Sequence, residues 1–129
     1  MGLIQGIEHF AIAAKDTVKL CEFYRDVLGF AVVYDNAKTP PTFFVKPAGG
    51  SMIEIIPAPD KPVVRRDNTD PGLTHVALGV ADLDAAMAEL KRRGIVFEGD
   101  VKVSGEVRAV FFRDPEGNIL HLVQRPTPL

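Results

Sequence analysis

The chain has 129 residues and a formal net charge of −2 at pH 7, with 47% hydrophobic and 25% charged residues. It contains no basic block and no run of about 18 apolar residues, so we expect neither a nucleic-acid-binding protein nor a membrane protein. The length suits a single domain of residues 1–129, and the one cysteine allows no disulfide within the chain. The amino terminus shows no apolar signal sequence, so we expect a cytoplasmic protein whose partner is a small molecule.

The first half of the chain predicts a strand, a helix and three further strands. The strand covers 7–13, Asp16 is a candidate helix cap, and apolar side chains then recur at helical spacing up to Gly29. Short runs with high β propensity follow the helix at 30–34, 42–45 and 52–56. This order of elements is a βαβββ unit.

A proline-rich segment separates the two halves of the chain. Residues 58–72 show no usable periodicity and contain the adjacent charges of Arg65 and Arg66. A connection of this length is either functional or a bridge between two structural units. We interpret it as a bridge, and a role as a lid is an additional hypothesis. For the arginine pair a solvated loop is the favoured interpretation, and closure over an anionic substrate is the alternative.

The second half repeats the order of the first about 66 residues later. A strand over 73–80 precedes Asp82, a second candidate cap, and an apolar helical stripe ends before Gly94. Three further strands are predicted at 95–97, 107–112 and 119–123. The expected fold class is therefore α+β, with repeats at 3–57 and 73–125 joined by the linker at 58–72.

The three histidines and one glutamate occupy matched places in these repeats. His9 and His75 lie in the first strand of each repeat, and His121 in the last strand of the second repeat matches Glu54 within one residue. Side chains two apart on a strand share a face, so the isoleucines on either side of Glu54 are expected to face the helix while Glu54 points away. The same alternation turns His75 and His121 to that opposite face.

An ionised carboxylate between apolar neighbours needs a partner or a metal ion. A single strand histidine is more often a hydrogen-bonded core residue, but the matched placement of all four favours one divalent metal ion bound by His9, Glu54, His75 and His121. Imidazole and carboxylate donors suit zinc, nickel, iron, cobalt or manganese better than calcium or magnesium. For His121 the alternative is a hydrogen bond to the substrate.

The remaining candidates are expected to be structural. Tyr24 lies on the apolar stripe of the first helix and is interpreted as core, and Cys21 is expected to be buried and inert. The phenylalanine pairs of two strands are expected to pack, with alternate members lining a pocket: Phe43, Phe44, Phe111 and Phe112.

Several motifs carry a resemblance to a known family. The segments IEHFAIA, FYRDVLGF, MIEII, THVALGVAD and FFRDPEGN resemble the vicinal-oxygen-chelate superfamily, which includes glyoxalase I, methylmalonyl-CoA epimerase, extradiol dioxygenases, fosfomycin-inactivating transferases and bleomycin-binding proteins. The resemblance implies a cupped mixed sheet around a metal site with helices on its outer face, and often a homodimer. It matches His9, Glu54 and His75 to ligand positions, whereas His121 stands where most metal-binding members have glutamate.

This resemblance implies a metal-dependent lyase or isomerase of the glyoxalase type, in which the metal stabilises an enediolate and Glu54 detaches to act as the catalytic base. Ala13 and Ala58 stand where glutathione-dependent enzymes would be expected to place contacts to the thiol conjugate, so another small oxygenated substrate is favoured. An iron(II) dioxygenase is the second hypothesis. A non-catalytic binding protein of the bleomycin-resistance type is the third.

Overall fold

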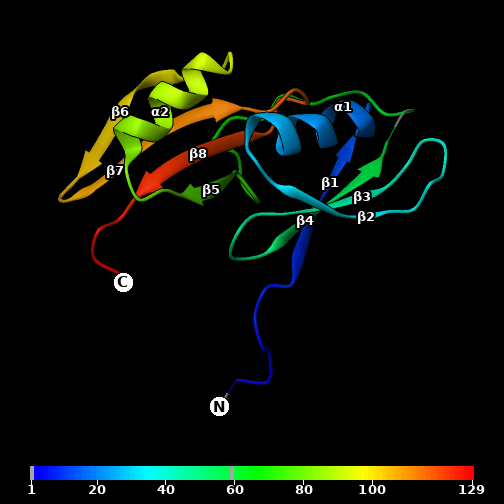
Figure 1. Cartoon of the computed structure of the whole chain (residues 1–129), viewed down its shortest axis with the longest axis horizontal. Helices are drawn as coiled ribbons and strands as arrows, with labels where there is room; N and C mark the ends of the chain where they lie inside the picture. Colours follow the sequence, from blue (N-terminus) through cyan, green and yellow to red (C-terminus); the bar gives the residue numbers. More distant parts are fainter. Residues whose placement is uncertain (1, 59) are drawn as a thin grey trace. The chain divides into compact units, whose positions relative to one another are not determined.

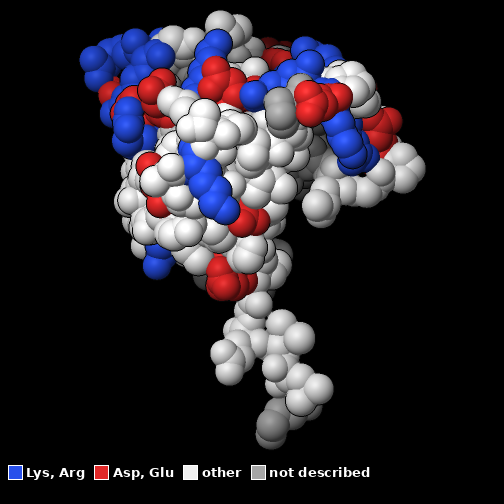
Figure 2. All heavy atoms as spheres, turned by 90° about the vertical axis from the view of Figure 1, so that its right-hand side faces the viewer, with Lys and Arg blue, Asp and Glu red and all other residues white. Residues whose placement is uncertain are grey.

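The computed structural model describes residues 2–58 and 60–129. The chain divides into two compact units, Met1–Val63 and Val64–Leu129, which are treated separately below (Figure 1). No helix in the described part of the chain is both long and apolar enough to span a membrane. On the face in Figure 2, basic and acidic side chains are intermixed.

Unit 1 is a four-stranded sheet with one helical segment. Its sheet has the order β1-β4-β3-β2, in which β1 runs parallel to β4 and the other neighbours are antiparallel. The helix α1 contacts β1, β3 and β4. The elements are β1 (His9–Ala14), α1 (Thr17–Glu22), a π-helical turn η1 (Phe23–Val27), β2 (Ala31–Asp35), β3 (Phe43–Lys46) and β4 (Met52–Pro57).

Unit 2 repeats this topology. Its sheet has the order β5-β8-β7-β6, with β5 parallel to β8, and its helix contacts β8. The elements are β5 (His75–Gly79), α2 (Leu83–Arg92), β6 (Glu98–Ser104), β7 (Val107–Arg113) and β8 (Ile119–Gln124). Both halves are therefore βαβββ modules, and the α+β fold class predicted from the sequence is confirmed.

The helix boundaries follow from local chemistry. The side chain of Asp16 accepts a hydrogen bond from the backbone nitrogen of Lys19 at 2.9 Å, and that of Asp82 accepts one from Ala85 at 3.0 Å. Each therefore satisfies a backbone donor that the first helical turn leaves unpaired. Gly29 and Gly94 follow the helical segments with φ of 79° and 93°, a conformation that favours glycine.

The core of each unit lies between its helix and one face of its sheet. In unit 1, Ile53 and Ile55 are buried while Glu54 between them is half-buried, as the strand alternation predicted. Leu120 and Leu122 are likewise buried on either side of His121 in unit 2. In both strands the apolar side chains therefore pack against the helix, and the candidate metal ligand, Glu54 or His121, lies on the opposite face.

Tyr24 and Cys21 belong to the core of unit 1. The Tyr24 side chain is fully buried, and Cys21 is 3% exposed. Burial raises the pKa of the Cys21 thiol, which disfavours the reactive thiolate. The structural interpretation of both residues is confirmed.

The predicted strand at 95–97 is wrong. Residues 95–97 precede the strand, Val96 is 83% exposed, and β6 begins at Glu98. The physical reason is that β6 is an edge strand, largely exposed, with hydrogen bonds to β7 alone, so it needs no alternation of apolar residues. Backbone pairing defines this strand, and a hydropathy pattern cannot detect it.

The described residues of 58–72 form no helix or strand. Within unit 2, the later part of this segment is held to the sheet, because the Arg113 guanidinium donates to the Arg66 carbonyl oxygen at 3.2 Å. Arg65 lies 3.4 Å from a Glu98 oxygen, and its side chain is 70% exposed. Arg66 donates to the carbonyl oxygen of Pro71 at 2.6 Å.

Candidate functional site

Unit 1 brings His9 and Glu54 together. His9 begins β1, and Glu54 lies on the adjacent strand β4, where its register partner is Ala11. The Nε2 atom of His9 is 3.8 Å from Oε1 of Glu54, and their side chains are 36% and 26% exposed. That separation is too long for a hydrogen bond. Two donors on one metal ion, each bound at about 2.1 Å, stand about 3.0 to 3.4 Å apart, so a small adjustment suffices for joint coordination.

Unit 2 brings His75 and His121 together. His75 begins β5, and His121 on β8 has Ala77 as its register partner. The two imidazole rings lie with their centroids 4.5 Å apart and their planes inclined at 43°. In both units, therefore, the first donor stands two residues before an alanine that pairs with the second donor. The two pairs occupy equivalent positions of their modules.

A phenylalanine accompanies each pair. Phe44 on β3 pairs in register with Glu54, and its ring centroid is 5.2 Å from that of His9. Phe111 on β7 pairs with His121, and its ring is 4.9 Å from His121 and 5.5 Å from His75. Their neighbours Phe43 and Phe112 are buried on the opposite face.

The first-strand histidines are oriented by hydrogen bonds at Nδ1. His9 Nδ1 lies 2.8 Å from Oε1 of Glu8, and His75 Nδ1 lies 2.7 Å from Oδ1 of Asn68 and 2.8 Å from Oγ1 of Thr74. A carboxylate or amide oxygen accepts hydrogen bonds only, so each contact places the proton on Nδ1. The lone pair of each neutral ring is then on Nε2, which is the arrangement found in histidine ligands of metal ions.

His121 has a different environment. Among the described residues, nothing forms a hydrogen bond with its buried Nδ1 atom. Burial lowers the pKa of His121 from the usual 6.5, and the neighbouring His75 lowers it further. The ring therefore remains neutral near neutral pH, with a nitrogen that lacks a protein partner. The neutral ring fits a metal ligand, whereas the unpartnered Nδ1 leaves His121 without the orienting hydrogen bond that His9 and His75 have.

Within each unit the structure brings two of the four residues together, His9 with Glu54 and His75 with His121. In the described part of the chain, no group of three or more His, Cys, Asp or Glu side chains is placed to hold a metal ion. A pair of donors holds a first-row metal weakly, and stable sites use three or four protein ligands. Ligation of one ion by His9, Glu54, His75 and His121 therefore stays a prediction.

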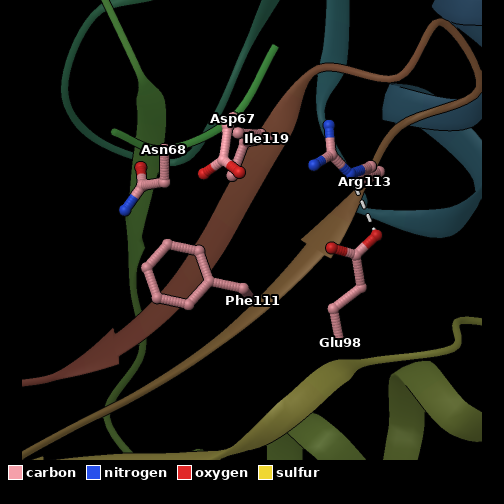
Figure 3. Close-up of a pocket in the computed structure, with 6 residues that line it drawn as sticks. All are labelled: Asp67, Asn68, Glu98, Phe111, Arg113 and Ile119. Atoms are coloured by element: carbon pink, nitrogen blue, oxygen red, sulfur yellow. Dashed lines mark hydrogen bonds and ion pairs between the residues drawn. The ribbon is translucent and has the colours of Figure 1, made fainter. Parts of the chain in front are cut away.

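A pocket of about 250 Å³ opens in unit 2 beside its histidine pair (Figure 3). Arg113, 16% exposed, donates from Nε to Glu98 Oε1 at 2.9 Å and from Nη1 to the Gly117 carbonyl oxygen at 2.9 Å. The pocket is lined by Asp67, Asn68, Glu98, Phe111, Arg113 and Ile119.

Sequence reasoning missed most of these polar residues. Asp67 and Asn68 lie in the linker, where no periodicity assigns a face, and Glu98 lies in the strand that the hydropathy pattern misplaced. Arg113 had a usable signal, because it is two residues after Phe111 on the same strand and therefore shares its face. Phe111 is one of the four phenylalanines of which alternate members were expected to line a pocket.

Comparison with known proteins identifies the family. A family model described as the Glyoxalase/Bleomycin resistance protein/Dioxygenase superfamily matches residues 6–122. The chain belongs to this superfamily. The resemblance carried by the sequence motifs is thereby confirmed over nearly the whole chain.

Several similar proteins align with nearly the whole chain. Uncharacterized protein YaeR of Escherichia coli (strain K12) is 33% identical over 97% of this chain and 99% of its own length. The solved structure of SMU.1112c has a TM-score of 0.79 and 28% identity, covering 93% of this chain and 98% of that one. TnmS3, an antibiotic binding protein from Streptomyces sp. CB03234, has a TM-score of 0.72 and 26% identity, covering 96% and 98%.

Other superfamily relatives differ in their named activities. Biphenyl-2,3-diol 1,2-dioxygenase 3 of Rhodococcus globerulus is 28% identical over 90% of this chain and 61% of its own. Metallothiol transferase FosB of Shouchella clausii (strain KSM-K16) is 27% identical over 93% and 80%. The mitochondrial methylmalonyl-CoA epimerase of Mus musculus is 30% identical over 85% and 66%. The superfamily thus includes several reaction types, and membership alone selects none of them.

Proposed function

We propose that this protein is a divalent-metal-dependent enzyme of the glyoxalase type, a lyase or isomerase acting on a small oxygenated substrate. The observation that carries the proposal is the pair of equivalent donor sets, His9 with Glu54 and His75 with His121, at the same register of two modules. The orientation of the two first-strand histidines through Nδ1 adds support, because it leaves Nε2 available.

The four donors would hold one ion of zinc, nickel, iron, cobalt or manganese. When bound, such a cation stabilises negative charge that develops on a substrate oxygen. Glu54 is the proposed base, and its carboxylate accepts the proton that leaves the substrate carbon. For that step the accepting oxygen must be uncoordinated. Phe44 and Phe111, beside the donors, limit the access of water.

Metal analysis of protein purified without chelator tests the proposal directly. We expect a stoichiometric divalent ion in the native protein and its loss in His75→Ala. Glu106→Gln, an exposed position outside the pairs, serves as the control and is expected to retain the ion. Native protein with no stoichiometric metal would contradict both this proposal and the dioxygenase alternative.

An iron(II) dioxygenase is the second candidate. Two histidines and one carboxylate, here His9, His75 and Glu54, are the donor set of many non-haem iron oxygenases, and the similarity to a biphenyl-diol dioxygenase supports this alternative. His121 argues against it, because the resemblance places a carboxylate at that position in extradiol enzymes. Two assays separate the dioxygenase from the lyase or isomerase. The first uses catechols in air, and the second uses 2-oxoaldehyde thiol adducts and 2-substituted acyl thioesters without oxygen. Oxygen consumption identifies the dioxygenase.

Binding without turnover is the third outcome of those assays. The similarity to TnmS3, an antibiotic binding protein, supports it. This function needs a cavity and no metal at the four donor positions, so a metal-free protein that binds a ligand would favour it.

We also propose a cytoplasmic homodimer, and light scattering of the purified protein tests its assembly.

A further inference from the structure

The pocket of unit 2 adjoins the histidine pair of the same unit. Asn68 lines it and contacts Nδ1 of His75 at 2.7 Å. Ile119 lines it and is the register partner of His75. Phe111 lines it and lies within ring contact of both His75 and His121. A substrate held at these histidines would therefore extend part of its structure into this pocket.

Two of the three guanidinium nitrogens of the pocket arginine donate to protein partners. Arg113 donates from Nε to Glu98 and from Nη1 to the carbonyl oxygens of Arg66 and Gly117. Its charge is balanced by the Glu98 carboxylate in direct contact. Its Nη2 atom forms no hydrogen bond with the described residues, but a carboxylate or phosphate that bound there would also approach the Glu98 carboxylate, whose charge repels an anion.

Each of the two carboxylates in the pocket retains an unused acceptor oxygen. Asp67 uses Oδ1 to accept from the backbone and hydroxyl of Thr69, and Glu98 uses Oε1 to accept from Arg113 and Arg65. Among the described residues, no hydrogen bond is formed by Asp67 Oδ2 or Glu98 Oε2. Figure 3 shows the two carboxylates on the open space that Phe111 also borders. The formal charge of the lining residues is negative, because two carboxylates face one guanidinium.

We propose that this pocket binds the distal part of the substrate and selects a hydrogen-bond donor of neutral or positive charge, an alcohol or an ammonium group. Asp67 and Glu98 accept from that group, and Phe111 and Ile119 contact the apolar part that carries it. Ligands with a carboxylate or phosphate at this end are rejected by like charge. The role as a substrate subsite rests on the proposed function, whereas the preference of the pocket does not need the metal.

Three small probes that lack a metal-chelating oxygen pair test the preference. Metal-free full-length protein is titrated with 2-phenylethylammonium, 2-phenylethanol and phenylacetate, and the backbone amide shifts of the pocket residues are followed by NMR. We expect saturable shifts at Asn68 and Phe111 with the first two probes and affinity lower by about tenfold for phenylacetate. The ammonium and alcohol titrations separate recognition of charge from recognition of a neutral donor.

Two isosteric variants assign the preference to the carboxylates. Asp67→Asn removes the charge and keeps the Oδ1 acceptor, so it is expected to lower the affinity for 2-phenylethylammonium by about tenfold and leave the fold unchanged. Glu98→Gln is the second variant, and Glu106→Gln is the matched control away from the pocket. Phenylacetate binding as tightly as the ammonium probe would overturn the proposal, as would an unchanged preference in both Asp67→Asn and Glu98→Gln.

Metal content is measured on the same preparations as purified, before the metal is removed for the titrations. A pocket that keeps its preference in a protein without stoichiometric metal supports the pocket proposal and contradicts the proposed function. A metal-loaded protein whose pocket shows no preference contradicts the pocket proposal alone. The two failures are therefore distinguishable.

Discussion

His9 and His75 differ from His121 in the contacts of their ring nitrogens. Glu8 and Asn68 accept from the Nδ1 atoms of the first two, whereas the buried Nδ1 of His121 has no partner among the described residues. Orienting hydrogen bonds fix the tautomer and the ring plane of a histidine ligand before the metal arrives. The three histidines are therefore unequal donors, and substitutions around them are expected to have unequal effects.

Asn68→Ala is expected to weaken metal binding by about tenfold, because it removes the amide oxygen that accepts from His75 Nδ1 and leaves Thr74 as the remaining contact of that atom. Asn68→Asp keeps an acceptor oxygen and is expected to retain the affinity. Competition with a chromogenic chelator measures both variants, and the NMR tautomer signals of His75 report the ring without metal. Wild-type affinity together with a wild-type tautomer in Asn68→Ala would contradict this role.

His121 makes the stability of the metal-free protein depend on pH. Its pKa lies below the ordinary 6.5 in the folded protein, because burial and then His75 disfavour the charged ring. The unfolded chain therefore binds more protons below about pH 6.5, so the free energy of unfolding decreases as the pH falls through that region. Urea unfolding with chelator between about pH 7.5 and pH 5.5 is expected to show this decrease, and His121→Gln should flatten it.

At the scale of elements, alternation along the strands predicted the faces of both donor strands. Ile53 and Ile55 are buried around Glu54 because one face of β4 packs on α1 while the other carries the donor. The sequence did not predict the edge strand β6, because this strand is formed by backbone hydrogen bonds with β7 and has no buried face that would require alternating apolar residues. For the same reason, Glu98, the first residue of β6, was not predicted as a residue of the candidate site. The π-helical turn η1 also has no periodic signature of its own.

Asp82→Ala is expected to lower the free energy of unfolding by about 1 kcal/mol, because the first turn of α2 loses the side chain that accepts from Ala85. Asp16→Ala removes the equivalent cap of α1 and should give a similar loss. Urea unfolding measures both, with exposed Asp100→Ala as the control. Equal stability of Asp82→Ala and the control would contradict this explanation of where α2 begins.

At the scale of the whole molecule, each module supplies one donor pair. The sequence predicted the four donors as one set, because the modules repeat and the donors recur at matched positions. It did not predict the contacts of Glu8 and Asn68 with His9 and His75. Glu8 lies just before β1 and Asn68 lies in the irregular linker, so neither residue belongs to a periodic pattern. The prediction that both pairs share one ion concerns the molecule as a whole.

If both pairs hold the same ion, removing a donor from either module has the same consequence. His9→Ala and His75→Ala are each expected to abolish the stabilisation by metal, which is about 2.7 kcal/mol at a free metal concentration 100 times the Kd. The double variant should lose no more than either single one. Thermal unfolding with metal and with chelator measures the difference. Separate, additive losses would indicate independent sites in the two modules.

The alanines that pair with the second donors have a consequence for how this scaffold changes. Ala11 stands in register with Glu54, and Ala77 with His121, and both are exposed. A methyl group is the smallest neighbour that an L-residue offers, so each donor has open space beside it that a larger side chain would occupy without disturbing the core. Fit to a ligand can therefore be adjusted at these two positions almost independently of folding, which lets one module architecture accommodate different molecules.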